Sequence, residues 1–347
     1  MASRTSIQVL CRYATWTLFL TPSTLWADIG VKCDESQGDI SCPEDRAHSS
    51  PFRTYPASPM QALSLTTQLR SAETVKQTEV FMVASAASVW ARSAELELDY
   101  YQNQVLTGIQ WQIADRLSAE VQYQYSWAGN NHLDPITVDF HDWVGLEQNG
   151  RLEEGNNQYN IDSNTYNLHI NDFENDTMLS AVHGYLQWQV LDIGAHALAL
   201  GGSLYYNKVN DSAFAASSFE QGIQVNYSYI RERSVIFSTL GGTIRSTNDD
   251  VFGQLPTKRF TGAWALGYGY KIFDNHELML EYHGYEGTLE DDSELSKASQ
   301  EVVLGYRYYL QNFAQFELSA TENIYNMDNS TDIVFSAGLR LFLAEKH

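Results

Sequence analysis

Apolar and polar residues alternate along most of the chain from about residue 78 onward, in blocks of 10 to 15 residues. In the block 301–310 one face carries Val302, Leu304, Tyr306, Tyr308 and Leu310, and the other carries Glu301, Gly305, Arg307 and Tyr309. A period of two residues is typical of a β-strand with unlike faces. The block length matches a tilted strand that crosses a bilayer. The pattern therefore predicts membrane-spanning strands with lipid on one face.

Later blocks show the same alternation between a lipid-facing and an inward-facing set of residues. In 260–272 the predicted lipid-facing set is Phe260, Trp264, Leu266, Tyr268, Tyr270 and Ile272, with Ala263, Gly267, Gly269 and Lys271 facing inward. Leu278, Leu280 and Tyr282 are sorted outward from Glu281 and His283 in the next block. The last block, 331–343, resembles the C-terminal strand of outer-membrane proteins, although five residues follow Phe342 here.

Turns give a second line of evidence, because outer-membrane barrels alternate short periplasmic turns with longer outer loops. Short connections are predicted near residues 114–116, 192–193, 231–233, 274–275 and 312–313, and longer polar stretches lie between them. The resulting strands are 79–91, 95–113, 117–127, 177–191, 195–207, 218–230, 234–246, 259–272, 276–286, 297–310, 315–326 and 331–343. Their even number predicts that the first strand begins and the last strand ends on the periplasmic side.

The fold class predicted from these patterns is all-β: a transmembrane antiparallel up-and-down barrel of about 12 strands over residues 78–347, with a short helix in a long outer loop. The chain has 21 Tyr, 15 Phe and 8 Trp but only 7 Pro, which suits strands. A mean hydropathy of -0.33, with no apolar run of about 20 residues beyond the N-terminus, excludes a helical membrane protein.

The N-terminal 77 residues have a different texture. Residues 1–27 combine Arg4 and Arg12 with a short apolar stretch and end on Ala27, which predicts a cleaved signal peptide and export to the Gram-negative outer membrane. Residues 28–77 hold four of the seven prolines and predict an irregular periplasmic or lumenal segment. Cys33 and Cys42 are then an even pair in an oxidising compartment, so we expect a disulfide.

The stretch after residue 130 does not alternate. Asp134 as N-cap and Pro135 at the first helical position predict a helix over 134–146 that narrows the barrel mouth or packs on the outer loops. Its polar members Asp139, His141 and Asp142 are candidates for a ligand site, although a solvated helix face explains them equally well. The stretch 159–170 is either an extra hairpin above the membrane or two more strands.

Residues in and beside this loop carry a family resemblance. They are Trp127, Gly129, Leu133, Asp134, Ile136, Phe140, His141, Gly145 and Arg151. In these positions the chain resembles a proteobacterial family designated domain of unknown function 3187. The resemblance implies an outer-membrane-like barrel and brings no catalytic residues to carry over.

The predicted inward face supplies the candidate site. Its charged or titratable members, the lumen-lining candidates, are Glu281, His283, Glu301, Arg307, Glu317 and Arg340. Charges are costly in lipid and ordinary in a wet interior, so these residues favour a pore, or a barrel that binds and transports a small solute or lipid. The alternative is a structural or surface-binding barrel whose lumen is braced by ion pairs, because twelve strands leave little room once side chains are placed.

An enzyme is the third reading. Some outer-membrane barrels act on lipids with a Ser–His pair, yet none of the nine His lies two residues before a Ser-Asn pair, and His183 and His283 fall on the predicted lumen face. We therefore expect no enzyme activity, and the ligand spacings predict no metal and no cofactor.

Charge and location limit the partners. The formal net charge of -22 argues against nucleic acid, whose binding needs Lys and Arg. We expect outer-membrane lipid and lipopolysaccharide as surroundings, and the barrel-assembly machinery as a partner during biogenesis. The sequence predicts no identity for the solute.

Overall fold

The computed structural model describes residues 49–92, 96–133, 158–246, 255–291, 293–326, 329, 331 and 333–343. The predicted signal peptide, Cys33, Cys42 and the loop-helix candidates Asp139, His141 and Asp142 lie outside these residues. The two helices within the described ranges are single 3-10 turns, η2 (Gln61–Leu63) and η4 (Glu294–Ser296). None of the helices described there has the length and apolar character needed to span a bilayer.

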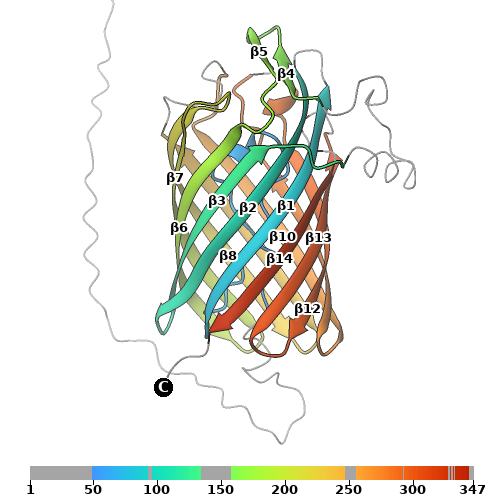
Figure 1. Cartoon of the computed structure of the whole chain (residues 1–347). Helices are drawn as coiled ribbons and strands as arrows, with labels where there is room; N and C mark the ends of the chain where they lie inside the picture. The colour runs from blue at the N-terminus through green and yellow to red at the C-terminus, as the bar shows by residue number, and fades with distance from the viewer. Residues whose placement is uncertain are drawn as a thin grey trace, which may run out of the picture.

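Within the described chain, twelve long strands form one antiparallel sheet that closes on itself (Figure 1). They are β1 (Thr78–Arg92), β2 (Glu97–Ala114), β3 (Leu117–Ala128), β6 (Thr177–Ile193), β7 (His196–Val209), β8 (Ala216–Arg231), β9 (Ser234–Arg245), β10 (Phe260–Phe273), β11 (His276–Tyr285), β12 (Ser299–Leu310), β13 (Ala314–Tyr325) and β14 (Ile333–Leu343). Each pairs with its neighbours along the chain, and β1 pairs with β14 from Thr78↔Leu343 to Ser88↔Ile333. The predicted up-and-down barrel is confirmed.

The stretch 159–170, which the sequence left open, forms a hairpin above the barrel. Its strands are β4 (Asn160–Ser163) and β5 (Leu168–Asn171), and β4 pairs with the extended end of β2 at Glu97–Asp99. Figure 1 shows this hairpin projecting beyond the barrel wall. These two strands therefore do not widen the barrel.

The two ends of the barrel differ. At one end, the short-turn end, strands are joined by connections of two or three residues such as Asp115–Arg116 and Asp274–Asn275. At the other, the long-loop end, lie β4, β5 and the longer connections. β1 starts and β14 finishes at the short-turn end, which in outer-membrane barrels faces the periplasm.

Side chains alternate across the wall as the sequence pattern predicts. Leu278, Leu280 and Leu304 are exposed on the outer surface, while their chain neighbours Glu277 and Glu281 are fully buried inside. The exposed outer set is apolar or aromatic on most strands and includes Leu186, Trp188, Leu204, Ile223, Leu240, Trp264, Tyr268 and Leu318. A continuous apolar wall of this kind is stable in lipid, so the membrane is the environment of the barrel.

Candidate functional site: the lumen and its plug

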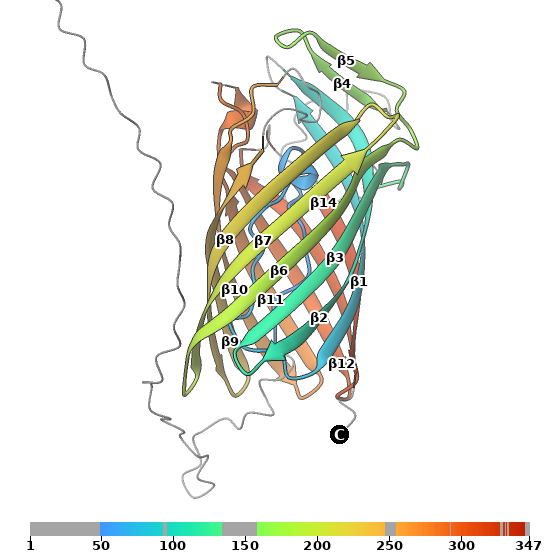
Figure 2. The ribbon, with the colours of Figure 1, turned by 90° about the vertical axis from the view of Figure 1, so that its left-hand side faces the viewer.

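The lumen holds a segment of the same chain. Residues 49–77, the lumenal segment, run inside the barrel as the blue trace of Figure 2 and continue into β1. Their contacts define two legs. The ascending leg, 49–60, runs from the short-turn mouth toward the long-loop end; the chain turns at η2 (Gln61–Leu63), and the descending leg, 64–77, returns. The lumenal segment, also called the plug below, therefore runs along the lumen twice, once in each direction.

The ascending leg is held by carboxylates of the β11–β12 wall. The backbone N–H of Phe52 donates to Glu281 Oε1 at 2.8 Å. The N–H groups of Ala57 and Ser58 both donate to Glu301 Oε1, at 2.9 and 2.8 Å. The N–H groups of this irregular backbone have no β-strand to pair with. A buried carboxylate that accepts them satisfies these donors and is itself stabilised by the hydrogen bonds.

Arg53 ties the ascending leg to the opposite wall. It forms an ion pair with Glu120 on β3 and another with Glu79 on β1 at 3.0 Å, and it donates to Gln110 at 2.6 Å. Its guanidinium lies 4.2 Å from the ring centre of Phe81. Burial works to lower the pKa of Arg53, but the facing carboxylates outweigh it and raise that pKa, so the side chain stays charged.

The descending leg contacts the β6–β9 side of the wall. Leu65 N donates to Glu220 Oε2 at 3.0 Å, and Ala72 N donates to Ser228 Oγ at 2.7 Å. Arg70 pairs with Glu120 at 2.7 Å, and its guanidinium lies 3.9 Å from the ring centre of Tyr185. Both legs therefore converge on the Glu120 carboxylate.

A second charged network braces the wall near the ascending leg. Arg307 on β12 pairs with Glu277 at 2.8 Å and with Glu317 at 2.6 Å, and Arg340 on β14 pairs with Glu317 at 3.0 Å. Arg307 also donates to the backbone carbonyl of Ser50 at 2.7 Å. The arginines and carboxylates of this network thus neutralise each other, and the arginines also donate to Ser50 and Pro51 of the lumenal segment.

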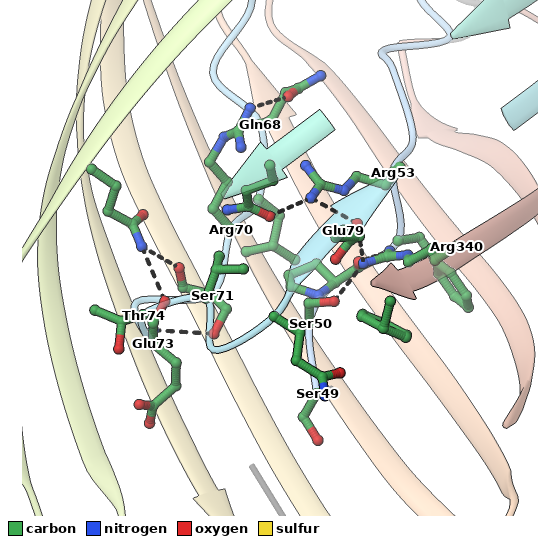
Figure 3. A pocket seen from close by; sticks show the side chains of 18 of the residues that line it. Ser49, Ser50, Arg53, Gln68, Arg70, Ser71, Glu73, Thr74, Glu79 and Arg340 are labelled. Carbon is green, nitrogen blue, oxygen red and sulfur yellow. Dashed lines mark hydrogen bonds and ion pairs between the residues drawn. The ribbon is translucent and has the colours of Figure 1, made fainter. Parts of the chain in front are cut away.

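The space left between the legs at the short-turn mouth is small. Figure 3 shows it between Ser49, Ser50 and Arg53 on one leg, Gln68, Arg70 and Ser71 on the other, and Glu79 and Arg340 on the wall. Its volume is about 60 Å³, which holds a few water molecules and no solute of sugar size. Glu281, Arg307 and Arg340 are each 0% exposed, so bulk water does not reach these lumenal side chains. In the part of the chain that the structure describes, the lumen is therefore filled by residues 49–77.

The long-loop mouth is closed differently, by an apolar cap. The tip of the lumenal segment contributes Met60, Leu63 and Leu65 to a buried cluster with strand ends and outer loops. Aromatic rings meet edge to face in it: Tyr159 with Phe173 at 5.7 Å, and Phe173 with Phe214 at 5.2 Å between centres. The legs are thus held by polar and charged contacts, although Phe52 and Leu69 also pack in an apolar cluster with Phe237 and Met279 of the wall, whereas the tip packs into the apolar cap.

The structure places all six lumen-lining candidates on the inner wall. Glu281, Glu301, Arg307, Glu317 and Arg340 are at most 3% exposed, and each contacts the lumenal segment or a partner that does. His283 lies beside Glu281, with Nε2 at 2.9 Å from Oε2. In the part of the chain that the structure describes, no cluster of three or more His, Cys, Asp or Glu is arranged to hold a metal.

Sequence reasoning missed the residues that grip the plug: Arg53, Arg70, Glu79, Glu120 and Glu220. A signal for Glu120 was present, because Glu120, Gln122, Gln124 and Ser126 alternate with apolar or aromatic residues along β3. No hydrophobic periodicity marks Arg53 or Arg70, because the lumenal segment does not alternate and so does not fix which way a side chain points.

The family model described as "Protein of unknown function (DUF3187)" matches residues 44–342. Among proteins whose function has been curated, none matches the sequence.

Solved structures share the barrel at very low identity. The KdgM porin in complex with disordered oligogalacturonate is 5% identical and covers 77% of this chain and 99% of its own, with a TM-score of 0.42. An outer membrane channel from Pseudomonas putida F1 is 10% identical over 77% of this chain and 96% of its own, with a TM-score of 0.48. The NanC porin is 9% identical over 76% and 100%, with a TM-score of 0.44. At these values the likeness concerns the fold alone.

Proposed function

The chain belongs to the DUF3187 family, and from that premise and the lumen geometry we propose that it is an outer-membrane channel for small polar solutes. The lumenal segment is its gate. The described conformation is the closed one, and the channel conducts when the legs of the segment leave the wall.

The observation that carries this proposal is the kind of contact that holds the legs. Phe52, Ala57, Ser58 and Leu65 are tied to the wall by N–H groups that donate to carboxylates, and Arg53 by ion pairs. Each of these wall groups tolerates water, so a displaced plug leaves a lumen that hydrates. A purely structural filling has no need of buried ion pairs, since apolar residues of similar volume stabilise as well or better.

Barrel size points the same way. About eight strands enclose a space that side chains alone fill, and twelve enclose more. Here the surplus is occupied by residues 49–77, a segment whose backbone continues into the barrel wall at β1 and whose other ties to the wall are non-covalent within the described chain. Its removal from the lumen would leave a passage lined by Glu281, Glu301 and Glu220, together with an apolar patch that includes Phe237 and Met279.

The apolar cap favours a second function, a structural or surface-binding barrel. The cap buries Tyr101, Phe173 and Phe214 with the plug tip, and a cluster of this kind resists hydration. In that reading the plug never leaves. The two functions differ in one measurable property, which is whether motion of the legs is coupled to conductance.

Disulfide pins test this coupling. Ser58 and Ser299 are hydrogen-bonded through their hydroxyls, and the hydroxyl oxygens of Ser71 and Ser228 are 3.3 Å apart. In a chain with Cys11, Cys33 and Cys42 replaced by serine, the pairs S58C/S299C and S71C/S228C tie the ascending and descending legs to the wall. The matched control is S85C/S336C, two lumen-facing wall residues of β1 and β14 whose hydroxyls are 2.8 Å apart.

In planar bilayers we expect the two oxidised leg pins to abolish channel openings and a reductant to restore them, while the control pin changes nothing. If the proteins with oxidised leg pins conduct equally before and after reduction, residues 49–77 do not act as a gate. A protein that is silent in every state, with legs free and Glu120 neutralised, contradicts the channel and favours the structural barrel.

A further inference from the structure

One wall of the lumen carries polar side chains with atoms that the lumenal segment leaves without partners. These residues, the polar ladder, are Gln122, Gln124 and Ser126 on β3, His183 on β6, and Tyr205 and Asn207 on β7. Each is at most 3% exposed. Both side-chain atoms of Gln124 and the hydroxyls of Ser126 and Tyr205 have no hydrogen-bond partner, nor do Gln122 Oε1, His183 Nε2 and Asn207 Nδ2.

Strand register gathers these groups into one patch. Gln122 pairs across β3–β6 with His183, which pairs across β6–β7 with Tyr205. Two residues further along the strands, Gln124 and Asn207 both flank Ala181. The patch extends about 14 Å along β3 and about 10 Å across three strands, as strand spacings require.

The patch has no net charge of its own. The charged groups that border it are paired: Arg70 with Glu120 at 2.7 Å, and Arg245 with Glu220 at 3.5 Å. What remains are amides, hydroxyls and an imidazole, which supply both donors and acceptors. The aromatic rings of His183 and Tyr205 meet at 6.2 Å between centres.

Buried polar atoms without partners are rare in folded proteins, and a group of them on one surface needs a cause. Packing against the plug is not the cause, because the plug satisfies little of this wall: Tyr55 OH accepts from Gln122 Nε2 at 3.3 Å, and that amide also contacts His183 Nδ1. Tyr55 therefore places only its hydroxyl against the ladder in this structure, while its ring packs against Phe81, Val83 and Leu106.

We propose that the polar ladder is a binding site for a neutral polyhydroxylated solute, of about disaccharide size, within the channel. The inference rests on the proposed function, since the site becomes accessible when the ascending leg withdraws Tyr55 and the tip of the lumenal segment leaves the apolar cap, in which Tyr205 is packed. Each sugar hydroxyl both donates and accepts, as the ladder requires, and the absence of unpaired charge disfavours an anion or cation.

The test measures binding and conductance on the same protein. Full-length Glu120→Gln protein, in which both arginine contacts of the gate are weakened, is purified in a detergent without sugar headgroups. Saturation-transfer NMR is recorded with maltose, with glucuronate as the charged probe and with tetraethylene glycol as a neutral probe poor in hydroxyls. Ion conductance of the same variant is recorded in bilayers.

We expect transfer to maltose and little to the other two probes. Adding Gln124→Leu and Asn207→Leu should weaken maltose binding by about tenfold or more, because unpaired donors and acceptors on the sugar are left behind. Tyr205→Phe removes one hydroxyl, keeps the ring and should weaken binding by a few fold. Thr321→Val, a lumen-facing change on β13, should leave binding within about twofold.

Each outcome separates the two proposals. Conductance without transfer to maltose overturns the site, whose unpaired atoms then only hold water, and keeps the channel. Transfer that depends on Gln124 and Asn207 in a protein that does not conduct keeps the site and overturns the channel. Equal transfer to all three probes, or equal transfer in every variant, also overturns the site. Heat-dependent migration on gels shows which variants are folded. If the Gln124→Leu variant does not fold, the loss of maltose binding in Tyr205→Phe tests the site instead.

Discussion

Arg53 and Arg70 lie on opposite legs of the lumenal segment, yet they bind the two oxygens of one carboxylate. Arg53 pairs with Oε2 of Glu120, and Arg70 pairs with Oε1 at 2.7 Å. The two legs are thereby fixed to each other and to β3 at a single point. A gate that depends on one shared carboxylate is sensitive to a single substitution.

The first prediction concerns Glu120→Gln. The amide keeps the shape but removes the charge that two buried guanidinium groups share, and breaking a buried pair in this way costs about 3–5 kcal/mol. We expect this cost to fall on the closed state, so that residues 49–77 become accessible. Limited trypsin digestion followed by mass spectrometry should show cleavage after Arg53 and Arg70 in the variant and little in the parent.

Glu317→Gln is its matched control. Glu317 also accepts from two buried arginines, but Arg307 and Arg340 both belong to the wall. We expect this variant to lower the free energy of unfolding of the barrel without selective cleavage after Arg70. If trypsin cleaves after Arg53 and Arg70 equally slowly in the parent and in Glu120→Gln protein, Glu120 does not hold the two legs in place.

The second prediction uses the close approach of the ascending leg to β12. A Cβ placed on Gly305 would lie 2.3 Å from the ring of Phe52 and 2.8 Å from the carbonyl oxygen of Leu318. Gly305→Ala should therefore push Phe52 from the wall and speed amide hydrogen exchange in residues 49–60. At Gly202 the nearest atom is 3.9 Å away, so Gly202→Ala is the control. Equal exchange in the two variants would mean that the leg does not depend on this contact.

The third prediction tests the lipid-facing wall. Leu280 and Leu304 are cross-strand partners on the outer surface, 50% and 60% exposed. Replacing either with Arg near the bilayer midplane should cost about 2–4 kcal/mol of folding free energy, measured by denaturant unfolding in liposomes. Leu280→Ala, which stays apolar, is the control and should cost less. An Arg variant as stable as the Ala variant would place this face away from lipid.

The barrel itself could be predicted from the sequence because the alternation that defines each strand lies within a few consecutive residues. Val302 to Leu310 alternate within a single strand, so lipid and lumen faces are sorted without knowledge of any partner, and the short turns fix the strand count. Glu301 and Arg307 could be assigned to the lumen for the same reason. The hairpin β4–β5 was left open because two short strands carry too few alternations to distinguish a wall strand from a loop.

The grip on the plug could not be predicted, because it joins distant residues through irregular backbone. Phe52 N and Glu281 are 229 positions apart, and Ser58 and Glu301 are 243 apart. The donors are main-chain N–H groups, which every non-proline residue has, so no residue type marks them. Only the closed three-dimensional barrel brings them to the carboxylates.

The measurement that tests the gate most directly is the conductance of one bilayer-inserted protein before and after its leg is untied. The protein carries Glu120→Gln together with S58C/S299C and no other cysteine. We predict silence while the disulfide is intact, and discrete openings in the same bilayer after a reductant is added. Conductance that is present with the disulfide intact and unchanged by reduction would contradict a gate formed by residues 49–77.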